Sequence, residues 1–120
     1  MGRAKDAVGH YGERVAVAHL IGQGMRLIER NWRCAAGELD AVLRDGDVLV
    51  VVEVKTRRGS NFGLPAEAVG RAKMARLRRL AAQWLAEHPT GGGCDVRFDV
   101  VSVWPQARGA ARVEHLRGAF

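Results

Sequence analysis

Acidic residues and a lysine lie close together in one short stretch of this 120-residue chain. They flank an Asp-Gly dipeptide at positions 45–46 and are Glu38, Asp40, Glu53 and Lys55. Like charges opposed on a sheet repel, and a buried unpaired carboxylate is costly, so the acids require a compensating cation. Lys55 supplies one positive charge, and carboxylate oxygens with water suit a divalent cation such as Mg²⁺. The stretch therefore predicts either a metal-binding cleft or a solvent-exposed hairpin face on which Lys55 forms surface ion pairs.

Two β-rich segments, residues 38–44 and 47–56, flank the dipeptide and predict a β-hairpin with a type I′ turn at residues 45 and 46. This register places Asp40 opposite Val51 and Glu38 opposite Glu53. Directly opposed Cβ atoms lie about 4.5–5.5 Å apart and diagonal neighbours about 7–8 Å, so Asp40 and Glu53 can reach a common point. A shift of one residue would send them to opposite faces of the sheet.

Side chains alternate between the two faces of a strand, so all four charged residues are expected on one side of the hairpin. Leu49 and Val51 share that side. Their presence favours a partly covered cleft over a solvent-exposed face.

The remaining elements follow from hydrophobic periodicity and turn signals. Helices are expected from Asp6 to about Gly22–Gly24 and over 66–87, strands over 25–32 and 96–104, a short edge strand over 112–116, and a loop over 57–63. The second hairpin strand is apolar on both faces, which is typical of a central strand covered on two sides. This order predicts an α/β or α+β fold, with a central mixed sheet flanked by helices, in a single domain over residues 1–120.

Composition narrows the class of partner. The chain has 19 Lys and Arg against 13 Asp and Glu, and the net charge of +6 points to a polyanion such as nucleic acid, although an arginine-rich composition also arises without a binding role. No apolar run approaches the roughly 20 residues that span a bilayer, and the first residues lack the apolar core of a signal peptide. The two cysteines show no metal-binding spacing. We expect a cytoplasmic protein without a membrane partner.

Glu13 is an unusual residue in the first predicted helix. It falls between Val17 and Leu20 on a helix whose apolar residues lie nearly all round, so burial on more than one side is expected. One interpretation is an ion pair with an arginine such as Arg14. If the helix packs over the acidic side of the hairpin, Glu13 becomes a further ligand or a substrate-positioning group.

The spacing of these residues resembles known nuclease motifs. Asp40 followed by Glu53-Val54-Lys55 resembles the signature of PD-(D/E)xK nucleases, which have the restriction-endonuclease-like fold, with Leu39 in place of the proline. Glu13 is similar to the extra acid of archaeal-type Holliday-junction resolvases. Roughly residues 5–105 resemble the YraN family of small bacterial proteins more closely, and the matching stretches are 12–13, 37–40, 52–57, 62–63, 65, 67–69 and 97–101.

The resemblance implies a restriction-endonuclease-like core and an endonuclease that uses Mg²⁺ or Mn²⁺. Asp40 and Glu53 would hold the metal with the Val54 carbonyl, and Glu38 or Glu13 would supply a further acid. Lys55 would orient or help to deprotonate the attacking water.

The expected substrate is DNA, with branched or structured DNA as one candidate. Arg57 and Arg58 in the loop after the site would clamp the phosphate backbone or would be solvated charges, and Lys73 on the second helix is a further candidate for binding nucleic acid. Asp99 is expected to pair with Arg97. Analogy with resolvases also allows a homodimer. The alternative function is a catalytically silent nucleic-acid-binding or adaptor protein on the same scaffold.

Overall fold

The structure is a computed structural model that describes residues 6–57, 70–89 and 94–120. Its elements are α1 (Ala7–Gly22), β1 (Arg26–Cys34), β2 (Gly37–Asp45), β3 (Val48–Thr56), α2 (Arg71–Glu87), β4 (Asp95–Trp104) and β5 (Arg112–Leu116). The five strands form one sheet in the order β1-β2-β3-β4-β5. The β3–β4 pair is parallel and the other three pairs are antiparallel, which confirms the expected mixed sheet of an α+β fold.

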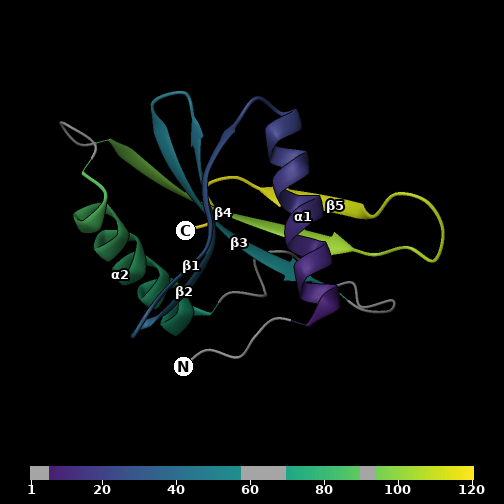
Figure 1. Ribbon diagram of the computed structural model, residues 1–120, viewed down its shortest axis with the longest axis horizontal. Coiled ribbons are helices and arrows are strands. Elements are labelled where there is room, and N and C mark those ends of the chain that lie inside the picture. Colours follow the sequence, from purple (N-terminus) through teal and green to yellow (C-terminus); the bar gives the residue numbers. More distant parts are fainter. Residues whose placement is uncertain (1–5, 58–69, 90–93) are drawn as a thin grey trace.

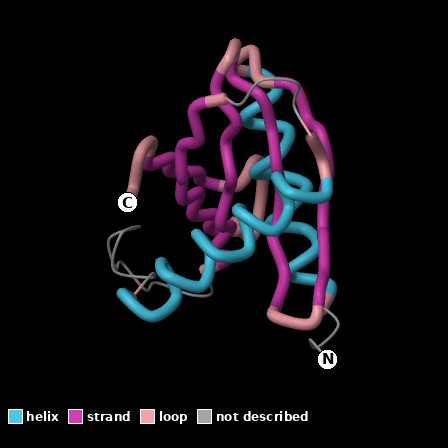
Figure 2. The backbone as a smooth tube through the Cα atoms, turned by 90° about the vertical axis from the view of Figure 1, so that its left-hand side faces the viewer, coloured by secondary structure: helices cyan, strands magenta, loops and turns pink. Residues whose placement is uncertain are grey.

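The two helices cover opposite faces of the sheet (Figure 1), and Figure 2 views the fold from the left-hand side of Figure 1, where α2 lies. On one face Val50 and Val52 of β3 lie in a cluster with Leu20 of α1. On the other face Leu49 and Val51 lie in a cluster with residues of α2. Because side chains alternate along a strand, the apolar run of β3 serves both clusters, as its sequence predicts.

Helix α1 begins after Asp6, whose side chain accepts a hydrogen bond from the Gly9 N–H at 2.8 Å as an N-cap. The buried residues of the helix form a single face and are Gly12, Glu13, Ala16, Val17 and Leu20. Ile21 is 48% exposed. The expectation of burial on more than one side was therefore wrong, because α1 is an outer layer that contacts the sheet along one face.

Helix α2 begins at Arg71, five residues later than expected, because Gly70 has an extended backbone (ψ 170°) and caps the helix. The expected start at 66 and most of the predicted loop lie among residues 58–69, outside the described residues. The buried face of α2 is Leu77, Leu80, Ala81 and Trp84. Arg78 and Arg79 are exposed on the other side of the helix.

The hairpin register differs from the prediction by two residues. Asp45 pairs with Val48 and Ala41 pairs with Val52, so the turn consists of Gly46 and Asp47. Gly46 has φ of +61° and Asp47 has no positive φ, which excludes a type I′ turn and fits a type II′ turn with glycine first. Asp45 is the last residue of β2, and its carboxylate pairs there with Arg97 at 3.1 Å and with Arg117. A shift of two residues preserves the face of every side chain, so the predicted grouping of charged residues survives.

Among the described residues, neither helix has the length and apolar character needed to cross a bilayer.

Candidate functional site

Strands β2 and β3 are paired from the turn as far as Ala41 and Val52, and the site lies just beyond this pair. The next residue of β2 is Asp40, whose Oδ2 accepts a hydrogen bond from the backbone N–H of Val54 at 2.8 Å. The carboxylate therefore takes a backbone donor of β3 where the regular ladder has ended. This bond joins Asp40 directly to the Glu53-Val54-Lys55 segment.

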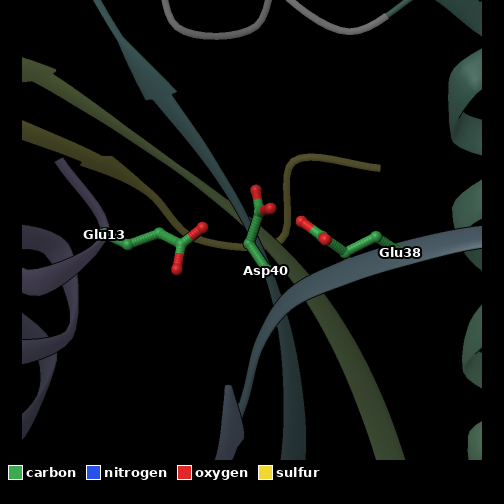
Figure 3. A group of neighbouring side chains, drawn as sticks. All are labelled: Glu13, Glu38 and Asp40. Carbon is green, nitrogen blue, oxygen red and sulfur yellow. The ribbon is translucent and has the colours of Figure 1, made fainter. Parts of the chain in front are cut away.

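Three carboxylates converge at this point. Oxygen atoms of Glu13, Glu38 and Asp40 all lie within 4.8 Å of one another. Asp40 lies between the other two, with Glu13 projecting from α1 and Glu38 projecting from the start of β2 (Figure 3). The donor set contains only carboxylate oxygens, so it suits a hard divalent cation such as Mg²⁺ or Mn²⁺.

The sequence analysis made a ligand role for Glu13 depend on its helix packing over the acidic side of the hairpin. In the structure Glu13 reaches the group from the opposite face of the sheet. Helix α1 packs on the side of Val50 and Val52, whereas the acidic side of the hairpin is covered by α2. Glu13 is 1% exposed, and it forms an ion pair with Arg30 at 3.6 Å instead of with the adjacent Arg14. Its carboxylate meets Asp40 because the two strands separate there.

A close contact between α1 and β3 holds Glu13 at this depth. A Cβ atom added to Gly12 would lie 1.8 Å from the Thr56 Oγ1 atom. Only glycine lets the helix backbone approach β3 so closely at this position. The residue beside Glu13 therefore sets the distance between the helix and the strand that carries Glu53 and Lys55.

A pocket of about 390 Å³ lies between the hairpin and α2. Its lining residues are Gly37, Glu38, Asp40, Glu53, Val54, Lys55, Lys73, Arg76 and Leu77. Asp40 and Glu53 are 8% and 6% exposed, so the alternative of a solvent-exposed hairpin face was wrong. The structure thus brings most of the sequence-predicted site residues to one concave surface, with Glu13 behind it.

Two lysines neutralise Glu53 in this pocket. The Lys73 and Lys55 ammonium groups both pair with Oε2 of Glu53, and the Lys55 distance is 3.4 Å. Burial lowers the pKa of Lys55, and the neighbouring Lys73 lowers it further. Burial also acts to lower the pKa of Lys73, but its hydrogen bond and charge interaction with Glu53 outweigh this effect and raise it.

Other predicted residues lie elsewhere. Arg57 is not among the lining residues, and its backbone N–H donates to the Val103 carbonyl at 2.8 Å. Arg58 lies outside the described residues. Asp99 pairs with Arg97 at 2.9 Å, as expected, and also contacts His115 at 2.7 Å.

Arg76 is a lining residue that the sequence reasoning missed. Its side chain is exposed, like those of its neighbours Arg78 and Arg79 on α2. Its spacing of three residues from Lys73 was the available signal, because residues at this spacing are neighbours on a helix surface.

Residues 12–103 match the model of a family described as "Uncharacterised protein family UPF0102". Similar proteins described as UPF0102 proteins occur in Beutenbergia cavernae, at 63% identity over 97% of this chain and 98% of the relative, and in Frankia alni, at 61% identity over 98% of each. A third relative, from Kineococcus radiotolerans, is 58% identical over 97% of this chain and 95% of its own length.

Among solved structures, a chain of Pyrococcus furiosus SfsA in complex with Ca²⁺ is similar at a TM-score of 0.36 and 13% identity. The likeness covers 92% of this chain and 63% of that chain, which is less than two thirds of its length. A TM-score at this level supports no conclusion about fold or activity.

Proposed function

This chain belongs to the uncharacterised protein family UPF0102, and we propose that it is a metal-dependent endonuclease that hydrolyses phosphodiester bonds in DNA. The observation that carries the proposal is the meeting of the Glu13, Glu38 and Asp40 carboxylates beside a pocket that also holds Glu53 and Lys55. The proposal includes a restriction-endonuclease-like identity for the sheet and its two helices.

The donor set fits a divalent cation. Asp40 and Glu53 would hold Mg²⁺ or Mn²⁺ with the Val54 carbonyl, and Glu38 and Glu13 would supply further oxygen atoms around Asp40. A divalent ion in such a site lowers the pKa of bound water and offsets charge on the phosphate. Glu13 is the least accessible of these acids, so its role in the proposal is to support Asp40 from the buried side.

Lys55 is the proposed catalytic amine. Its ammonium lies 3.4 Å from Glu53, inside the pocket where a scissile phosphate would be bound. Because its pKa is lowered, Lys55 gives up its proton more readily than an ordinary lysine does. In its charged form the amine would stabilise the negative charge that develops on the phosphate.

The wall of the pocket formed by α2 would bind the phosphate backbone. Lys73 and Arg76 line this wall opposite the acids, and the net charge of +6 favours a polyanion. We extend the proposal to Arg57 and Arg58 as backbone contacts after β3. Branched DNA is the candidate substrate that motivates testing for a homodimer, since symmetric cutting of two strands requires two sites.

Cleavage assays on supercoiled, branched and single-stranded DNA with Mg²⁺ or Mn²⁺ test the proposal. We expect Asp40→Ala and Lys55→Ala each to reduce the cleavage rate by about 100-fold or more. Asp47→Ala is the matched control, because Asp47 is an exposed acid in the hairpin turn, and it should cleave like the wild type. Metal-dependent cutting that persists in both site variants would indicate a contaminating nuclease and would remove the proposal.

A catalytically silent nucleic-acid-binding or adaptor protein is the alternative. It is favoured by one observation, which is that Lys73 and Lys55 already neutralise Glu53. DNA binding with a steep salt dependence, unaccompanied by cleavage under every metal condition, would support this alternative.

A further inference from the structure

Glu53 carries two ammonium groups on the same oxygen atom, and one of them comes from a different layer of the fold. Lys55 belongs to the same strand as Glu53, whereas Lys73 reaches it from the first turn of α2. The Glu53 side chain is 7% exposed, so its charge requires a nearby cation whenever it is ionised. The described residues thus supply that cation from the protein itself.

We infer that Lys73 is the resident counter-ion of Glu53, and that a divalent cation entering the pocket must displace the Lys73 ammonium from that carboxylate. The inference rests on the proposed function, because it assumes that Glu53 is a metal ligand. Lys55 and Lys73 already share Oε2 of Glu53, and a divalent cation at the same carboxylate would add two further positive charges beside them, so the three cations would repel one another strongly. Metal binding and the Lys73–Glu53 ion pair therefore compete.

The Lys73 ammonium can move away from Glu53, whereas the Glu53 carboxylate is held in a buried position. Its side chain is 31% exposed and has four rotatable methylene groups, so the ammonium has a direct route to water. Arg76 follows three residues later on α2 and lines the same pocket. A displaced Lys73 ammonium would remain beside Arg76 at the pocket wall, where a phosphate group of the substrate would be held.

Displacement of Lys73 couples the binding of metal to the binding of nucleic acid, so that each ligand raises the affinity for the other. Metal binding releases a cation for the phosphate backbone, and a bound phosphate holds Lys73 away from Glu53. Coupling of this kind is reciprocal, so each ligand strengthens the binding of the other by the same factor. In the absence of nucleic acid, Lys73 acts as an internal competitor that weakens metal binding.

The test is a titration of the protein with Mn²⁺ in the absence of DNA. Electron paramagnetic resonance measures the concentration of free Mn²⁺ at each step. We expect Lys73→Met to lower the Kd for Mn²⁺ by about tenfold or more, and Lys73→Gln to do the same. Lys73→Arg keeps the competing charge and should stay within about threefold of the wild type. Arg71→Met is the matched control, because it removes one positive charge from the same helical turn at an exposed position outside the pocket lining.

The outcomes separate this inference from the proposed function. If the wild type binds Mn²⁺ and neither Lys73→Met nor Lys73→Gln binds it more tightly than Arg71→Met does, the competition is refuted while the metal site stands. If neither the wild type nor any variant binds Mn²⁺, the proposed metal site is refuted and the inference is refuted with it. Circular dichroism of each variant establishes that the fold is retained.

Discussion

The contact between Gly12 and Thr56 gives the sharpest prediction for the fold. In Gly12→Ala the new Cβ would lie 1.8 Å from Thr56 Oγ1, 3.0 Å from Thr56 Cβ and 3.1 Å from Thr56 Cγ2. Rotation of the threonine side chain moves Oγ1 but leaves its Cβ in place, so the helix must also move. An ordinary contact of 3.4 Å requires an opening of about 1.6 Å if Oγ1 stays in place, and about 0.4 Å from Thr56 Cβ if the side chain rotates.

Overpacking of this kind costs about 1–3 kcal/mol, whereas alanine favours a helix over glycine by about 1 kcal/mol. We therefore expect Gly12→Ala to lower the free energy of unfolding by up to about 2 kcal/mol. Because Glu13 is the next residue, its carboxylate should also withdraw from Asp40. Affinity for Mn²⁺ should fall in the same variant.

Urea denaturation followed by tryptophan fluorescence measures the change. Gly22→Ala is the matched control, since it lies at the end of the same helix with no atom within 4 Å of the added Cβ, and it should be neutral or stabilising. Thr56→Ala removes Oγ1 and Cγ2 and should recover at least part of the loss in the Gly12→Ala background, as a positive coupling in a double-mutant cycle. Equal stability of Gly12→Ala and Gly22→Ala would refute the argument from close packing.

Three further predictions concern other parts of the molecule. Burial tends to raise the pKa of Asp99, but hydrogen bonds from His115 and Arg97 outweigh this effect and lower the pKa from 3.8 to about 2. The resulting stabilisation of about 2 kcal/mol is present above pH 4 and is lost as the pH falls towards 2. The denaturation midpoints of the wild type and Asp99→Asn should therefore converge at low pH, and a constant gap between them would contradict this. Gly46→Ala should lower the free energy of unfolding by about 1–2 kcal/mol in the same denaturation assay because φ at Gly46 is +61°, and an unchanged value would argue against the type II′ turn. Arg76→Ala should weaken DNA binding and reduce the slope of log affinity against log salt by about one, as measured by fluorescence anisotropy, and an unchanged slope would remove Arg76 from the proposed phosphate wall.

The local elements were predictable from sequence because each is encoded by a short-range pattern. Alternation in residues 38–56 predicts two strands and places Asp40 and Glu53 on one face, and in the structure both residues line the same pocket. This grouping holds despite the wrong turn, since a register error of two residues leaves the period-2 pattern unchanged. The turn position was wrong, since Asp45 belongs to β2, where its carboxylate pairs with Arg97, a residue far away in the chain.

Several contacts at the site join residues that are distant in the sequence, and no local pattern predicts them. The burial of Glu13 followed from its apolar neighbours on the helix, whereas its partner Arg30 and its meeting with Asp40 did not. The pairing of Lys73 with Glu53 joins a helix to a strand across residues that no periodicity links.

The sequence by itself therefore determined the strands, most of the helical boundaries and the face on which the charged residues of the hairpin lie. Tertiary structure decided which distant groups meet there: α2 closes the pocket with Lys73 and Arg76, and α1 brings Glu13 to Asp40 from the other face. The physical reason is that local patterns depend on backbone geometry within a few residues. The depth at which a helix sits against a sheet depends instead on contacts such as Gly12 against Thr56 and on the point at which β2 and β3 separate.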